Sequence, residues 1–176
     1  MKQVLVFGGS TSKTSINKKL ATYASTLLND AISKVLDFND YDFPIFSVDE
    51  ESKSGLPEAV DVLFDEFEKS DGFIISLAEH NGSYAAAFKN ILDWLSRKEY
   101  KMFANNPVLL LATSPGGRGG KSVLEAAKQF FPYMAANVTG SFSLPSFNDN
   151  FKEDKIVNTE FSNELEALVL VFEKQI

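Results

Sequence analysis

The sequence predicts an α/β fold in which helices cover both faces of a doubly wound, five-stranded parallel sheet, with strand order 2-1-3-4-5. Two observations support it. Short, continuous apolar runs alternate with longer segments whose apolar residues recur at helical spacing, and this alternation repeats five times along 176 residues. Continuous apolar strands are typical of parallel sheets that are buried on both faces. The length corresponds to one domain, residues 1–176.

Each predicted strand is a short apolar run bounded by residues that are typical of turns. The first run ends at a Gly-Gly pair and the second, which is weaker, ends at Asn-Asp; the third begins at a glycine and the fourth follows a proline. The fifth mixes apolar with small residues. In chain order the predicted strands are Val4–Phe7, Val35–Phe38, Gly72–Leu77, Val108–Ala112 and Val138–Leu144.

Each predicted helix carries apolar residues three or four positions apart, which places them on one face. The second helix begins at a proline, which suits a first helical position. The third follows the turn Asn81-Gly82, with Ser83 as its expected N-cap. Two polar stretches, Asp49–Gly55 and Phe147–Thr159, are expected to be loops. The predicted helical segments are Ile16–Leu28, Pro57–Phe67, Ser83–Arg97, Val123–Phe131 and Phe161–Phe172.

Five strand–helix units favour this arrangement over a six-stranded Rossmann sheet, for which 176 residues leave little room. The composition limits the chemistry that the side chains can perform. With no cysteine and one histidine, the chain lacks thiolate nucleophiles, cysteine-ligated metals and multi-histidine metal sites. The net charge of −7 argues against a nucleic-acid binder, and no apolar run approaches the ~20 residues of a membrane span. A cytoplasmic protein whose chemistry comes from a bound cofactor is expected.

Three unusual loops follow the first, third and fourth predicted strands, whose carboxyl ends lie side by side in this strand order. The first loop, Gly8–Asn17, has five hydroxyl residues among the six from Ser10 to Ser15 and leads into a helix. Free N–H groups at a helix start, together with hydroxyl donors, favour a phosphate site. A P-loop is excluded because Phe7 and Ser12 stand where it needs glycine.

The second and third loops favour a flat ring system next to that phosphate. His80 stands beside an Asn-Gly turn, which lets backbone and ring lie against a planar ligand. The third loop, Thr113–Lys121, has four glycines around one of the two arginines, so its backbone can approach a ligand closely. The three loops together describe a site for a mononucleotide of flavin type.

On these residues the chain resembles the NADPH-dependent FMN reductase family, which has a flavodoxin-like fold and includes quinone, chromate and azo-dye reductases. The family's opening motif, Gly-Ser-x-Arg-x-x-Ser-x-Asn, matches here except that Ser12 replaces the arginine. Its second motif matches with Ala78 for a proline and His80 for a tyrosine. The most specific match is the stretch Lys89–Arg97, Lys-Asn-Ile-Leu-Asp-Trp-Leu-Ser-Arg.

The resemblance implies that FMN accepts hydride from NADPH or NADH and passes the electrons to a small-molecule acceptor, a free flavin or a quinone. No side chain is expected to be catalytic, because the flavin carries the chemistry. The resemblance also implies a homodimer or a dimer of dimers, with the surface around Trp94 as the candidate interface, and Lys13 or Arg118 as the partner of the NADPH 2′-phosphate. The implied FMN-binding residues are Ser10, Ser12, Ser15, Ile16 and Asn17 at the phosphate, and Glu79, His80, Asn81, Gly82, Ser114, Pro115, Gly116, Gly117 and Arg118 around the ring.

Two other functions fit parts of the pattern. A flavodoxin-like electron carrier would bind FMN without reductase activity of its own, and the negative net charge suits docking on basic partners. A nucleotide-sugar or deoxyribosyl-type transferase on a related sheet would need a carboxylate nucleophile, for which Glu79 is the candidate.

Overall fold

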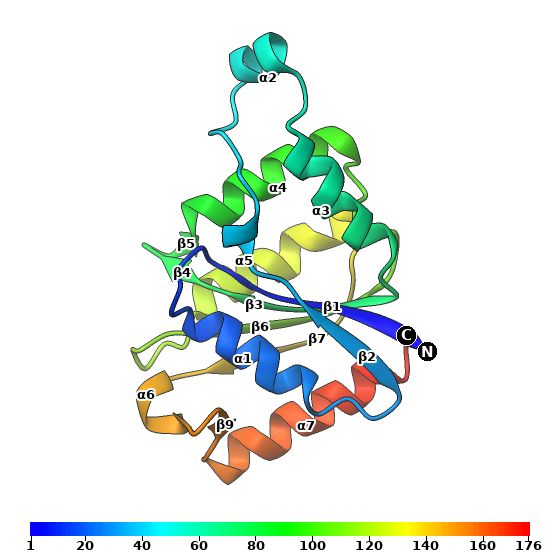
Figure 1. Cartoon of the computed structure of the whole chain (residues 1–176). Coiled ribbons are helices and arrows are strands. Elements are labelled where there is room, and N and C mark those ends of the chain that lie inside the picture. Colours follow the sequence, from blue (N-terminus) through cyan, green and yellow to red (C-terminus); the bar gives the residue numbers. More distant parts are fainter.

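Five parallel strands form the central sheet in the order β2-β1-β3-β6-β7 (Figure 1), so the predicted fold class and strand order are confirmed. The computed structural model describes all 176 residues. The strands are β1 (Lys2–Gly9), β2 (Ala31–Val35), β3 (Gly72–Leu77), β6 (Pro107–Thr113) and β7 (Asn137–Leu144).

Helices cover the sheet on both sides (Figure 1). On one side lie α1 (Ile16–Ser25) and α7 (Thr159–Glu173); on the other lie α3 (Glu58–Glu68), α4 (Ala86–Lys98) and α5 (Lys121–Phe130), which continues into the 3₁₀ helix η2 (Phe131–Met134). Alternate strand residues feed the two cores: Leu5 and Phe7 pack under α3 and α4, whereas Val4 and Val6 pack under α1 and α7.

The strand register brings the ends of three strands level. Gly9 at the end of β1 pairs with Leu77 at the end of β3, and Leu77 pairs with Ala112 of β6. The loops that follow these strands therefore start side by side at one edge of the sheet, as the sequence predicts.

The second strand lies earlier than predicted. It runs over Ala31–Val35 at the edge of the sheet, where most of its side chains are exposed, so its sequence need not be apolar. The apolar residues Leu36 and Phe38 are buried, but they follow the strand and enter the core as the chain turns into the 3₁₀ helix η1 (Phe38–Asp40).

The stretch predicted as the loop Asp49–Gly55 is helical instead. Helix α2 (Val48–Ser54) begins after Ser47, whose Oγ accepts a hydrogen bond from the backbone N–H of Glu50 at 3.0 Å, and it ends at Gly55, which has a φ of +73°. A serine followed three residues later by glutamate is a sequence signal for a helix start. The helix is exposed and stands out from the body (Figure 1).

Ser83 is not the cap of α4. It belongs to a short hairpin, β4 (Glu79–His80) and β5 (Ser83–Tyr84), and α4 begins after Ala85 without a side-chain cap. Asn81 and Gly82 both have positive φ, as a two-residue type I′ hairpin turn requires. The Asn-Gly signal therefore closes a hairpin rather than preceding a helix.

The polar connection from Phe147 to Thr159 is also more ordered than predicted. It holds the short helix α6 (Phe147–Asn150) and a second hairpin, β8 (Phe151–Lys152) with β9 (Lys155–Ile156). The aromatic rings of Phe147 and Phe151 stack at 4.7 Å within the core under α7, which anchors the segment. None of the helices is long and apolar enough to cross a membrane.

Trp94 is fully buried, so its side chain cannot serve as an exposed interface residue, contrary to the sequence-based expectation. The segment before α2 covers it: the indole Nε1 donates to the carbonyl oxygen of Pro44 at 2.7 Å, and the ring of Phe46 packs edge-on against the indole. Asn90 of the same helix donates to Pro44 and accepts from the N–H of Phe46. These residues attach the segment to α4.

Candidate functional site

A cavity of about 290 Å³ opens at the carboxyl ends of β1, β3 and β6. Between β1 and β3 the chain changes the direction in which it adds strands to the sheet, and ligands of open parallel sheets bind at such a switch point. The cavity combines parts of all three loops singled out by the sequence. Its lining residues are Ser10, Ser12, Thr14, Ser15, Ile16, Asn17, Ala78, Glu79, His80, Thr113, Ser114 and Pro115.

One end of the cavity is the N-terminus of α1. The Oγ of Ser15 caps the helix by accepting from the N–H of Lys18 at 3.1 Å. The N–H groups of Ile16 and Asn17 donate to no acceptor within the chain, nor do the hydroxyls of Ser12 and Thr14. Unpartnered N–H groups at a helix N-terminus carry partial positive charge and are suited to a phosphate.

Gly8 allows α1 to start this close to the sheet. A Cβ atom at this position would lie 2.5 Å from the backbone nitrogen of Lys18 and 2.8 Å from its Cα. Any side chain at position 8 would thus push the first turn of the helix away from β1, and with it the free N–H groups.

The side chain of Asn17 is used to hold the site together. It is buried, its Nδ2 donates to the carbonyl oxygen of Thr113, and its Oδ1 accepts from the N–H of Thr113 and from the Oγ of Ser76. The backbone N–H of Asn17 is left for a ligand. Asn17 therefore positions α1 against β3 and β6.

The opposite wall comes from the β4–β5 hairpin. Glu79 and His80 line the cavity, while the turn residues Asn81 and Gly82 are exposed outside it. The Oε2 of Glu79 accepts a hydrogen bond from the N–H of Val123 at 3.0 Å. Helix α5 begins after Gly120, which has no side chain that could cap it, so Glu79 supplies the acceptor from another element. This bond ties the hairpin to the helix that follows the glycine-rich loop.

The segment after β7 holds the glycine-rich loop in place through backbone hydrogen bonds. The N–H of Ser146 donates to the carbonyl oxygen of Gly116 and the N–H of Phe147 donates to that of Ser114, both at 3.0 Å. Gly119 has a φ of +60°, and a Cβ there would lie 2.9 Å from the backbone nitrogen of Pro145. Only glycine fits this close approach in this conformation. These contacts fix the path of the loop against the segment after β7.

The structure brings most of the predicted binding residues into one cavity. Five others lie outside it: Asn81, Gly82, Gly116, Gly117 and Arg118 are exposed around the rim, and Arg118 donates to the hydroxyl of Ser122 at 2.8 Å. The predicted set omits three lining residues, Thr14, Ala78 and Thr113. Each is adjacent in sequence to a predicted residue: Thr14 and Thr113 belong to the predicted loops, and Ala78 stands where the family motif has proline.

No lysine or arginine lines this cavity, and Lys18 in the first turn of α1 is already paired. The Nζ of Lys18 lies 2.6 Å from Asp37, and this hydrogen bond lowers the pKa of the Asp37 carboxyl to about 2. The phosphate end of the cavity therefore relies on neutral donors and the helix terminus.

Residues 2–149 match the family model described as NADPH-dependent FMN reductase. The chain is 30% identical over 115 residues to a quinone reductase of Escherichia coli, a match that covers 65% of this chain and 60% of that enzyme. It is 30% identical over 135 residues to an NADPH azoreductase of a Bacillus species, covering 77% of this chain and 71% of that one.

Among solved structures, the chain is similar to FerB, a flavoenzyme NAD(P)H:(acceptor) oxidoreductase from Paracoccus denitrificans. The TM-score is 0.78 at 25% identity, and the superposition covers 99% of this chain and 97% of FerB. The matched residues thus span less than two thirds of the E. coli quinone reductase but nearly the full length of FerB.

Proposed function

The chain belongs to the NADPH-dependent FMN reductase family, and from this premise we propose that it binds FMN in the cavity beyond β1, β3 and β6 and transfers hydride from NAD(P)H to a small-molecule acceptor, a quinone or a flavin. The family membership supports an NAD(P)H-dependent oxidoreductase as the class of enzyme. The acceptor and the residues that bind the cofactor are our proposal.

One observation carries the proposal: the row of unpartnered donors at the start of α1. A phosphate monoester there would accept hydrogen bonds from the N–H groups of Ile16 and Asn17 and from the hydroxyls of Ser10, Ser12 and Thr14. These donors are neutral and converge at the N-terminus of a ten-residue helix. The residues present therefore fit the phosphate of FMN without the arginine that the family motif has at position 12.

The ring would lie between the β4–β5 hairpin and the glycine-rich loop. Ala78, Glu79 and His80 would contact one side through backbone and ring atoms, and Ser114 and Pro115 the other. When bound, the flavin supplies the hydride-accepting chemistry, which no side chain here can replace. The chain's own part is to fix the ring through two walls that Glu79 connects.

The rim of the cavity would receive the nicotinamide and the acceptor in turn. Gly116, Gly117 and Arg118 are exposed there, and the glycines leave room above the ring. The guanidinium of Arg118 brings positive charge to the rim, where it would stabilise negative charge that develops on a reduced ring or a bound phosphate.

We further propose that the protein acts in the cytoplasm, where reduced nicotinamide nucleotides are available, and that it forms a homodimer. With Trp94 buried, the supporting observation for the dimer is a group of exposed aromatic side chains near the ends of α4 and α5: Tyr100, Phe130 and Tyr133. Large exposed apolar groups of this kind are typical of interfaces. Sedimentation of the wild type and of Tyr133→Glu tests this, since a dimer through this surface would dissociate in the variant.

Anaerobic mixing of the FMN-loaded protein with NADPH tests the reductase. We expect the visible absorption of the flavin to bleach within seconds and to return when a quinone is added. An FMN-loaded protein whose oxidised spectrum persists would instead be a flavodoxin-like carrier. A protein that binds no FMN would contradict both the reductase and the carrier, and would favour the transferase.

The matched variants Ser12→Ala and Ser33→Ala test the phosphate end. The hydroxyl of Ser12 faces the cavity and has no partner in the chain, whereas Ser33 is exposed on β2. We expect Ser12→Ala to weaken FMN binding about three- to tenfold, because one hydrogen bond to a charged phosphate is lost. Ser33→Ala should leave the affinity unchanged.

A further inference from the structure

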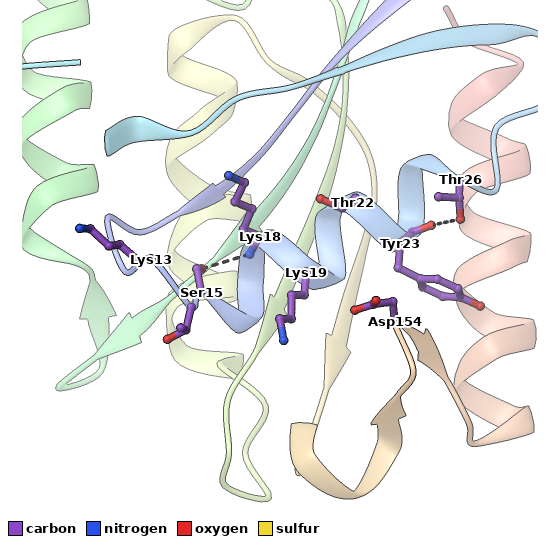
Figure 2. A pocket seen from close by; sticks show the side chains of 9 residues that line it. Lys13, Ser15, Lys18, Lys19, Thr22, Tyr23, Thr26 and Asp154 are labelled. Carbon is purple, nitrogen blue, oxygen red and sulfur yellow. Dashed lines mark hydrogen bonds between the residues drawn. The ribbon is translucent and has the colours of Figure 1, made fainter. Parts of the chain in front are cut away.

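A second cavity, of about 420 Å³, runs along the outer side of α1 (Figure 2). It begins where the first one ends, because Thr14 and Ser15 line both. The volume is within the range of sites for nucleotide-sized ligands, ~300–1,000 Å³. Its other lining residues are Lys13, Lys18, Lys19, Thr22, Tyr23, Thr26 and Asp154.

The floor of this groove is one stripe of α1. Ser15, Lys19, Thr22 and Thr26 follow one another at intervals of four, three and four residues, so they lie on the same side of the helix. With a rise of ~1.5 Å per residue, this stripe extends ~16 Å from the proposed phosphate position. The groove is thus an elongated continuation of the phosphate end.

The charges along the groove are ordered. Lys13 lies at the end next to Ser15 and Lys19 in the middle, and neither forms an ion pair within the chain (Figure 2). Lys18 is bound to Asp37. Toward the other end lies Asp154, in the turn of the β8–β9 hairpin, again without an ion-pair partner.

We propose that this groove holds an adenosine monophosphate unit joined to the flavin phosphate, so that the site accepts FAD in addition to FMN. Lys13 and Lys19 would bind the second phosphate, which follows directly on the one at α1. The ring of Tyr23 and the hydroxyls of Thr22 and Thr26 would contact the sugar and base. Asp154 would accept hydrogen bonds from a ribose hydroxyl or the adenine amino group.

The position of Asp154 favours a nucleotide over a bare anion. A carboxylate in the same groove repels a free inorganic phosphate, but it is a suitable acceptor for the uncharged donors at the far end of an adenylate. The cationic end adjoins the flavin cavity and the acidic residue lies away from it, which matches the order phosphate, then sugar and base. The inference rests on the proposed function, since it places the flavin phosphate at α1.

Calorimetric titration of the flavin-free protein with FMN and with FAD tests the proposal. We expect FAD to bind at least as tightly as FMN. Lys19→Gln should weaken FAD binding about three- to tenfold, as expected for the loss of one partly exposed contact between charges, and change FMN binding less than twofold. Lys53→Gln, which removes the same charge from the exposed helix α2, is the matched control and should affect neither flavin.

The results separate failure of this inference from failure of the proposed function. FMN binding with much weaker FAD binding, or an equal effect of Lys19→Gln on both flavins, would overturn the FAD site and leave the reductase proposal intact. Absence of binding by either flavin would overturn the proposed function itself. As a third arm, NADP⁺ is titrated into the FMN-loaded protein. If Lys19→Gln weakened the binding of NADP⁺ but not that of FAD, the groove would belong to the nicotinamide nucleotide, and the FAD site would be contradicted.

Discussion

Asn17 bonds to both backbone groups of Thr113, donating from Nδ2 to the carbonyl oxygen at 3.2 Å and accepting at Oδ1 from the N–H at 3.0 Å. The same Oδ1 accepts from the hydroxyl of Ser76 at 2.7 Å. All three residues are buried. One amide thus connects the first turn of α1 to the ends of β3 and β6, the three elements from which the cavity is built.

Asn17→Ala should therefore lower the free energy of unfolding by about 3 kcal/mol, because buried donors and an acceptor lose their partners. Urea unfolding followed by Trp94 fluorescence measures it. Asn163, which is exposed on α7, provides a matched control, and Asn163→Ala should change stability by less than ~0.5 kcal/mol. Equal effects of the two substitutions would contradict the role assigned to Asn17.

The bond from Val123 to Glu79 predicts a difference between two substitutions at position 79. Glu79→Ala removes the acceptor that caps α5 and frees the hairpin from the start of that helix, so FMN affinity should fall about tenfold. Glu79→Gln retains an oxygen acceptor and should lose less than about threefold.

Flavin fluorescence quenching measures both affinities. Glu125→Ala, on the exposed side of α5, is the control and should bind FMN like the wild type. If Glu79→Gln were as weak as Glu79→Ala, the carboxylate would act on the ligand by its charge rather than by holding α5.

Acid should remove the contribution of the Lys18–Asp37 pair. Because the hydrogen bond from Lys18 lowers the pKa of Asp37 from 3.8 to about 2 in the folded protein, the pair stabilises the fold above pH 4 and is lost as the pH falls from 4 to 2. Both side chains are about one third exposed, so solvent screening reduces the contribution to about 1 kcal/mol.

Asp37→Asn should accordingly be about 1 kcal/mol less stable than the wild type at pH 7, and this difference should fall well below half its size near pH 2, where half of the Asp37 carboxyls are protonated. Chemical unfolding at a series of pH values shows this directly. Asp42→Asn, an exposed carboxyl without an ion pair, should follow the wild type at every pH. A stability difference for Asp37→Asn that was as large at pH 2 as at pH 7 would mean that packing, not charge, is responsible.

Trp94, the only tryptophan, is buried under residues 44–46, so its fluorescence reports on whether the segment before α2 stays in place. Trp94 is 0% exposed, so its emission should be blue-shifted and resist acrylamide quenching. Trp94→Phe removes the indole N–H that donates to Pro44 and should increase tryptic cleavage at Lys53 in α2 about fivefold, since a hydrogen bond contributes about 1 kcal/mol.

Arg97→Gln breaks the exposed ion pair to Glu51 in α2 but leaves Trp94 in place. Its effect on cleavage should be smaller, because exposed ion pairs contribute little. Faster cleavage in Arg97→Gln than in Trp94→Phe would show that α2 is attached by the ion pair rather than by the indole.

The central strands and the main helices could be predicted from the sequence because their patterns match their environments. The segment Gly72–Leu77 is apolar throughout because β3 is buried on both faces, and Val60, Leu63, Phe64 and Phe67 recur at helical spacing because α3 buries one face. The edge strand β2 was predicted a few residues too late in the chain, because its exposed residues need not be apolar and its place is set by pairing with β1.

In the candidate site, too, some features could be predicted from the sequence and others could not. Its hydroxyls and glycines stand out in the sequence, since a phosphate cradle and a close backbone approach demand these residue types locally. Asn17, in contrast, looks like a ligand contact in a motif, and only the packed structure shows that its amide is engaged with Ser76 and Thr113. Such a role depends on residues 59 and 96 positions away.

By itself, the sequence determined the strand order, the three loops and the resemblance that carry the proposal, because each depends on local pattern and on residue type. Tertiary structure alone decided that Trp94 is buried by its own chain, that Glu79 caps α5, and that a groove lined by Lys19 adjoins the phosphate end. These features arise where segments distant in sequence meet, and no local periodicity records such contacts.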